Sequence, residues 1–281
     1  GVACYSKPSI GTQACSGAIV CRLPEITDAR VAHEWFLWQN WLNKENPILD
    51  PYSKRSLSSS MTDFTALRTA MVDCQIRPSD VTKFPIIEAM LLIRREQFVP
   101  TGMRDVAYAG DHIQLGKNRV VLDPRVLAKM LDALEIQPDE LVLDVACGLG
   151  YCAAVIGHLA EAVIAVEEDE ALASEAETNL ADEAVDNAVV VAGPLIGGAA
   201  KHGPYDVIAI PGGVQEIPSD LLAQLKDGGR IGAVFVMGEG GQGAGQFRVG
   251  IKTPNGVAWR NVFDATAPLL PGFEREVDFA L

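Results

Sequence analysis

The sequence of 281 residues lacks the features that mark membrane and secreted proteins. No apolar run reaches the ~18 residues that a membrane-spanning helix needs. No basic stretch followed by an apolar one opens the chain, which begins with Gly1 rather than Met. Six cysteines occur but no C-x-x-C pair, and Cys74, Cys147 and Cys152 lie in apolar segments. This usage predicts reduced, buried thiols in a cytoplasmic protein.

Metal-ligand patterns and basic clusters are also missing. The four histidines, at positions 33, 112, 158 and 202, show no metal-ligand spacing, so we expect no metal site. The formal net charge is −14, and residues 61–281 hold 32 Asp and Glu against 17 Lys and Arg. Because an acidic surface repels phosphate backbones, nucleic acid is not an expected partner.

The pattern of the sequence changes near residue 61. Residues 1–60 show no sustained periodicity, carry four aromatic residues between Trp35 and Trp41, and end in a serine-rich tract. They are interpreted either as a partner-binding arm or as a tag or upstream sequence before a start at Met61, and the serine-rich tract favours the second interpretation. We therefore predict an N-terminal extension over 1–60 and one domain over 61–281.

Strands and helices alternate through the second region. Helices are predicted over residues 61–76, 84–93, 124–134, 151–160, 169–183 and 219–225, with Asp123 and Ser219 as helix caps. Strands are predicted over 141–145, 162–166, 188–192, 206–210 and 230–237, with a hairpin of 245–251 and 256–263 at the sheet edge. Residues 98–122 are predicted to be irregular. The order predicts an α/β fold with a doubly wound, mostly parallel, Rossmann-like sheet, preceded by N-terminal helices.

A glycine-rich loop follows the first predicted strand. In an open α/β sheet, ligands bind beyond the carboxyl ends of the strands. The first strand, 141–145, has Asp144 near its end, and the turn of Gly148 and Gly150 follows it. The backbone of these glycines can approach a ligand without an intervening Cβ atom. Glu167 ends the second strand, where its carboxylate is able to accept both hydroxyls of a ribose. The arrangement predicts a cofactor that contains adenosine.

Two cofactors fit this loop. The run from Gly148 to Ala153 satisfies the G-x-G-x-x-G/A pattern of dinucleotide-binding proteins, which leaves a nicotinamide oxidoreductase as one alternative. Asp144 favours S-adenosylmethionine, because a carboxylate suits a cationic sulfonium and fits badly beside a pyrophosphate. The other interpretation of Asp144 is a carboxylate that caps the following helix.

Several segments resemble the protein-L-isoaspartate O-methyltransferase family, in order and in approximate spacing, from about Met61 to Leu281. They are Arg94–Pro100, Ala107–Ala109, Asp144–Tyr151, Val166–Glu167, Tyr205–Ile208, Glu216–Pro218 and Leu225–Gly229. The resemblance implies a class I methyltransferase-like domain that uses S-adenosylmethionine to methylate a carboxylate of isoaspartyl residues in damaged proteins. It also implies a cofactor site made of Asp144, Ala146, Cys147, Gly148, Gly150, Tyr151, Glu167 and Gly193.

The segment that matches the family's substrate loop, Gln114–Pro124, departs from the family pattern. The threonine and serine hydroxyls of that pattern become Val120 and Leu122, and Leu122 has no group that can hydrogen-bond to a substrate carboxylate. No catalytic residue is therefore assigned. Arg119 is a candidate for gripping the substrate carboxylate in place of the hydroxyls, and the simpler interpretation is that Lys117 and Arg119 are solvated loop cations. These replacements keep open a second function, an interaction protein that retains only the cofactor fold.

Overall fold

The computed structural model describes residues 62–237 and 244–275. The chain divides into two units, Gly1–Ser60 and Met61–Leu281. The predicted N-terminal extension lies outside the described residues, so its nature stays a prediction.

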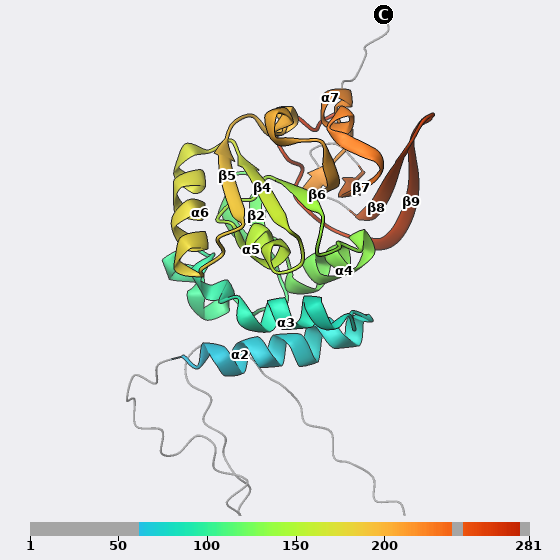
Figure 1. Ribbon diagram of the computed structural model, residues 1–281. Helices are drawn as coiled ribbons and strands as arrows, with labels where there is room; N and C mark the ends of the chain where they lie inside the picture. Colours follow the sequence, from blue (N-terminus) through green and yellow to red (C-terminus); the bar gives the residue numbers. More distant parts are fainter. Residues whose placement is uncertain (1–61, 238–243, 276–281) are drawn as a thin grey trace, which may run out of the picture. The chain divides into compact units, whose positions relative to one another are not determined.

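A seven-stranded sheet forms the centre of the domain, with the strand order β5-β4-β3-β6-β7-β8-β9 (Figure 1). The strands are β3 (Leu141–Val145), β4 (Ala162–Glu167), β5 (Ala188–Ala192), β6 (Tyr205–Val214), β7 (Leu225–Val236), β8 (Gly245–Thr253) and β9 (Gly256–Ala265). The five strands from β5 to β7 run parallel, and β8 and β9 extend the sheet as an antiparallel edge hairpin. This confirms the predicted doubly wound fold.

The helices of the α/β part are α4 (Pro124–Leu134), α5 (Tyr151–Gly157), α6 (Glu170–Asp182) and α7 (Ser219–Ala223). Asp123 caps α4 as predicted, since its carboxylate accepts from the backbone N–H groups of Arg125 and Val126. The prediction that Ser219 caps α7 is wrong: Ser219 is the first helical residue, and it follows Pro218, which has no side chain that could cap. The helix also ends before Leu225, because that residue already belongs to β7.

Two helices precede the α/β part and lie side by side at one end of it (Figure 1). They are α2 (Phe64–Met71), which continues as a π-helical turn over Val72–Ile76, and α3 (Phe84–Leu92). Helix α3 packs against α2, α4 and α5. One face of each helix is buried in the main core, with Met71 from α2 and Ile86, Ile87 and Met90 from α3. The predicted N-terminal helices are therefore an integral layer of the domain.

The segment predicted to be irregular contains a short hairpin. Strand β1 (Ile113–Gly116) pairs with β2 (Arg119–Val121) in a separate antiparallel sheet. The connecting turn places Asn118 at φ 58°, a left-handed conformation that asparagine tolerates better than most residues. The strands escaped prediction because each is only three or four residues long. This β1–β2 hairpin lies within the segment that matches the family's substrate loop.

The cysteines only partly follow the prediction. Cys74, Cys147 and Cys152 are all free thiols, and Cys147 and Cys152 are buried. Cys74 is exposed, so its predicted burial is wrong, because it faces outward from the π-helical turn. Among the helices of residues 62–237 and 244–275, none combines the length and the apolar character needed to cross a membrane.

Candidate functional site

The glycine loop lies at the point where the sheet changes direction. From β3 the chain proceeds to β4 and β5 on one side, and it later returns to β6 and β7 on the other. Residues 146–150 follow β3 at its carboxyl end, the location where such sheets bind ligands. Gly148 and Gly150 take φ values of 58° and 95°, which only glycine adopts without strain. Ala146 takes φ 73° in the same loop, a left-handed conformation that strains a residue with a Cβ atom.

Glu167 meets this loop from the neighbouring strand. The parallel register pairs Val145 of β3 with Val166 of β4, so the carboxyl ends of both strands reach the same edge. The Glu167 carboxylate is fully buried and accepts from the backbone N–H of Gly148 at 2.7 Å. Its other oxygen accepts from the N–H groups of Glu168 and Asp169 at 3.0 and 3.2 Å. The structure therefore brings the glycine turn and Glu167, which were expected at the same edge of the sheet, into direct contact.

Arg119 of β2 forms an ion pair with Glu167. The guanidinium Nη2 donates to the same carboxylate oxygen that accepts from Gly148, and the two side chains are 9% and 0% exposed. Sequence reasoning placed Arg119 either at a substrate carboxylate or in solvent. The structure instead directs it into the site, against the residue proposed to hold the ribose.

Asp144 is the second buried carboxylate of the site. Although the Cys152 thiol lies nearby, neither oxygen of Asp144 has a hydrogen-bond partner of normal geometry among residues 62–237 and 244–275. The interpretation of Asp144 as a helix cap is therefore wrong. Burial raises the pKa of Asp144 from 3.8 to about 7, and the Cys152 thiol and the Arg119 guanidinium lower it only in part. An unpartnered carboxylate of this kind suits a cationic group of a ligand.

Tyr151 and Leu122 lie at a small cavity between the glycine loop, the end of β2 and β6. The cavity measures about 20 Å³, and its lining includes Cys147 and Pro211. The Tyr151 ring is buried between Phe98, at 5.7 Å between ring centroids, and the Arg95 guanidinium, at 4.7 Å from the ring centroid. The structure thus places Tyr151 and Leu122, from two different predicted motifs, at one cavity.

Gly193 takes the remaining predicted position, at the end of β5. Its N–H donates to the Glu167 carbonyl at 2.9 Å, which fixes it beside the proposed ribose-binding residue. No heavy atom lies within 4 Å of the place that a Cβ atom would take at Gly193. Space is therefore available on this side of Glu167.

Arg95 holds the substrate-loop segment in place. Its segment was recognised from the sequence, but no role was predicted for this residue. This fully buried guanidinium donates to the carbonyl of Ala107 and to the carbonyl of Leu122, each at 2.7 Å. Arg95 belongs to the Arg94–Pro100 segment that resembles the family. The segment therefore joins the chain before the β1–β2 hairpin to the chain after it.

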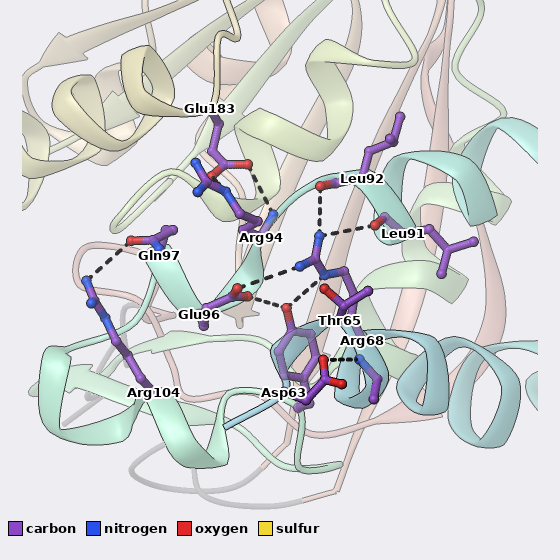
Figure 2. A network of polar contacts seen from close by, with 12 residues as sticks. Asp63, Thr65, Arg68, Leu91, Leu92, Arg94, Glu96, Gln97, Arg104 and Glu183 are labelled. Carbon is purple, nitrogen blue, oxygen red and sulfur yellow. Dashed lines mark hydrogen bonds and ion pairs between the residues drawn. The ribbon is translucent and has the colours of Figure 1, made fainter. Parts of the chain in front are cut away.

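A neighbouring polar network fastens the same segment to the N-terminal helices (Figure 2). Glu96 accepts from the Tyr108 hydroxyl and lies 3.6 Å from the Arg68 guanidinium. Arg68 also donates to the carbonyls of Leu91 and Leu92 at the end of α3. Arg94 pairs with Glu183 after α6 at 2.5 Å. These contacts hold the Arg94–Pro100 segment against both the helical layer and the sheet domain.

The residues fit an adenosyl cofactor in chemistry and in position. A backbone turn free of Cβ atoms, a carboxylate at the end of the next strand and an unpartnered buried carboxylate occur together at the switch point. The whole loop 144–150 is buried, and Leu115 of the β1–β2 hairpin lies against Gly148. In the described ranges, no three His, Cys, Asp or Glu side chains gather in the manner of a metal site.

Comparison with known proteins gives a consistent picture. The family model described as protein-L-isoaspartate (D-aspartate) O-methyltransferase matches residues 68–249. A protein-L-isoaspartate O-methyltransferase of Rhodopseudomonas palustris is 35% identical over 175 residues, which cover 62% of this chain and 71% of that protein. A Synechococcus relative of the same name is 30% identical and covers 81% of this chain and 94% of its own.

Solved structures support the fold. A Plasmodium falciparum structure, titled as this type of methyltransferase in complex with S-adenosyl-L-homocysteine, superposes with a TM-score of 0.60 at 16% identity. The match covers 75% of this chain and 99% of that one. At this level of identity the likeness concerns the fold alone.

Proposed function

Because this chain belongs to the protein-L-isoaspartate (D-aspartate) O-methyltransferase family, we propose that it methylates the carboxylate of isoaspartyl residues in damaged proteins, with S-adenosylmethionine as the methyl donor. The observation that carries the proposal is the contact between the Gly148 N–H and the Glu167 carboxylate at 2.7 Å, at the carboxyl ends of two adjacent strands. In this proposal the ribose side of the donor site consists of two segments that are separate in sequence, the glycine loop after β3 and the end of β4.

Each predicted residue has a role in this proposal. Glu167 binds the ribose hydroxyls, and the turn of Gly148 and Gly150 lets the backbone approach the donor closely. Asp144 offsets the donor's positive charge, because its buried carboxylate has no other partner. Ala146, Cys147, Tyr151 and Gly193 line the site by their positions in the two loops.

The reaction demands positioning more than acid–base catalysis. The sulfonium of S-adenosylmethionine supplies the methyl group, and the acceptor carboxylate is already ionised at neutral pH. The protein therefore needs no strong general base and has to align the acceptor oxygen with the methyl carbon. Leu122 and Tyr151 contribute buried side chains to the wall of the small cavity at this place.

The two other functions have less support. A nicotinamide cofactor would bring its pyrophosphate close to the buried Asp144 carboxylate, and like charges at a buried site repel strongly. An interaction protein without activity rests on the replacements at Val120 and Leu122. The family match extends over both the donor loop and the substrate-loop segment, which favours the enzyme.

The partners and location follow the same proposal at a coarser level. The substrate is a protein or peptide that bears isoaspartyl residues, and the net charge of −14 disfavours nucleic acid. The three cysteines of the described ranges are free, as expected of the cytoplasm. The function is assigned to residues 61–281.

The test combines binding with turnover. Calorimetric titrations with S-adenosylhomocysteine and NADH are followed by methyl transfer to an isoaspartyl peptide, with the aspartyl peptide of the same sequence as the control. We expect binding of S-adenosylhomocysteine only and turnover of the isoaspartyl peptide only. Binding of NADH alone, or equal methylation of both peptides, contradicts the proposal.

A pair of variants tests the position of the donor. Gly148→Ala adds a Cβ atom at φ 58° in the donor loop, 2.7 Å from the Leu115 Cδ1 atom, and Gly228→Ala adds one at φ 80° at an exposed position of β7 with open space. Both carry a similar backbone strain. We expect Gly148→Ala alone to weaken S-adenosylhomocysteine binding, by about 10-fold or more, since a close contact is lost. Equal affinities in two folded variants refute the placement.

A further inference from the structure

The acceptor sites of Glu167 are all in use. An ionised carboxylate offers about four lone-pair sites on two oxygens. One oxygen accepts from the backbone N–H groups of Glu168 and Asp169, and the other accepts from the Gly148 N–H and from Arg119. Three of these donors belong to the backbone of the loops that form the site. Arg119 is the one side-chain donor, so it is the group that can leave when ribose hydroxyls bind.

The β1–β2 hairpin, residues 113–121, also covers the glycine turn. Leu115 of β1 reaches so close to Gly148 that a Cβ atom there would lie 2.7 Å from its Cδ1 atom. Beneath the end of the hairpin, the cavity of about 20 Å³ has room for little more than one water molecule. Ligand pockets commonly measure about 300–1,000 Å³. While the hairpin stays in this position, Leu115 and Arg119 therefore occupy the approach to Gly148 and Glu167.

The two ends of the hairpin are held separately from its tip. Before β1, the Nε2 atom of His112 lies 3.0 Å from the Thr266 carbonyl oxygen, and its Nδ1 atom accepts from the Asp123 N–H at 2.9 Å. After β2, Arg95 donates to the Leu122 carbonyl. Between these anchors, Arg119 and Leu115 supply the contacts to the donor site. The hairpin can therefore lift while its ends stay in place.

We propose that the β1–β2 hairpin is a self-inhibitory cover, latched by the ion pair of Arg119 with Glu167, and that the donor binds only after this latch opens. The inference rests on the proposed function, which supplies the donor. The Arg119 guanidinium occupies the place where the ribose of the donor has to bind Glu167. It also places a positive charge near Asp144, as the sulfonium of the donor would do. The apparent affinity for the donor is then reduced by the fraction of molecules that are closed.

Substitution of Arg119 separates the latch from the rest of the site. Arg119→Met keeps the length and apolar stem of the side chain and removes its charge. Lys117→Met removes an exposed charge from the tip of the same hairpin and is the matched control. Arg119→Lys restores a charge without the guanidinium and should give an intermediate result. Circular dichroism and thermal unfolding establish that each variant is folded.

Two measurements read out the latch in the full chain. Hydrogen exchange of the ligand-free protein follows the backbone amides of residues 113–121, and we expect faster exchange in Arg119→Met than in wild type or Lys117→Met. Calorimetric titration with S-adenosylhomocysteine follows affinity, and we expect a gain of about 10–100-fold in Arg119→Met, the equivalent of one lost charged hydrogen bond in the closed state.

The outcomes separate this inference from the proposed function. Equal exchange rates in wild type and Arg119→Met overturn the latch, whatever the titration shows. Faster exchange with unchanged or weaker binding also overturns it, because the hairpin then does not control access. If exchange is faster in Arg119→Met but no variant binds S-adenosylhomocysteine, Arg119→Lys included, the result supports the latch. It then refutes S-adenosylmethionine as the donor.

Discussion

Asp144→Asn is the most informative substitution in the donor site. It replaces a fully buried carboxylate, whose two oxygens have no hydrogen-bond partner, by a neutral side chain of nearly the same shape. Burial is the main cause of the raised pKa of Asp144, so the substitution isolates the cost of placing a negative charge at this position.

The size and sign of the effect follow from the pKa values. The pKa of Asp144 is about 7 in the folded chain, against a reference of 3.8. Because the folded state binds this proton more tightly than the unfolded state, the contribution to stability is greatest below pH 4. It is lost as the pH rises from 4 to 7, by about 4 kcal/mol in total. Asp144→Asn removes this pH-dependent loss of stability. If the new amide also lacks hydrogen-bond partners, it lowers the free energy of unfolding by roughly 1–3 kcal/mol.

Urea unfolding at a series of pH values, followed by circular dichroism, measures this difference. Other titrating groups contribute equally to both proteins, so they cancel when the two free energies of unfolding are subtracted. We expect the variant to gain stability relative to wild type as the pH rises from 5 to 8, and no further above pH 8. A difference that does not change with pH shows that Asp144 is solvated or paired, and refutes the argument.

Three further substitutions have clear expectations. Ala146→Gly should raise the free energy of unfolding by about 0.5–1 kcal/mol, and urea unfolding checks this. The substitution removes the strain of φ 73°, and the greater entropy of glycine in the unfolded chain offsets part of that gain. Arg95→Met should lower the free energy of unfolding by about 2–4 kcal/mol through two lost hydrogen bonds to buried carbonyls, whereas Arg125→Met, at an exposed position, should change it little. Leu122→Ser should raise kcat/KM for an isoaspartyl peptide by about 10–100-fold, because a hydroxyl that hydrogen-bonds to a carboxylate is restored; methyl-ester release measures it, and an unchanged rate indicates that the acceptor binds elsewhere.

The architecture was predictable because its signals are local. The buried strands β3 and β4 are short apolar runs between helices, and Asp123 and Asp169 cap the following helices through contacts two or three residues away. Each signal lies within one turn or one strand. The order of such elements then restricts the sheet to a doubly wound topology.

The closure of the site could not be predicted in the same way. The ion pair of Arg119 with Glu167 joins residues 48 positions apart, and nothing in the local sequence of either residue indicates its partner. The hairpin that carries Arg119 has strands too short for a periodic pattern. Sequence reasoning placed Glu167 at a ribose and Arg119 either at a substrate carboxylate or in solvent, without any sign that the two would meet.

The buried charges explain why closure and donor binding compete. With Asp144 ionised, the site holds two carboxylates and one guanidinium, so Arg119 offsets only part of the buried negative charge. Removal of Arg119 alone would leave two buried anions near each other, which is unfavourable in a medium of low dielectric constant. A cationic donor that replaces Arg119 restores the compensation and provides hydroxyls for Glu167. The same electrostatic demand that keeps the hairpin closed therefore favours a positively charged ligand in the open state.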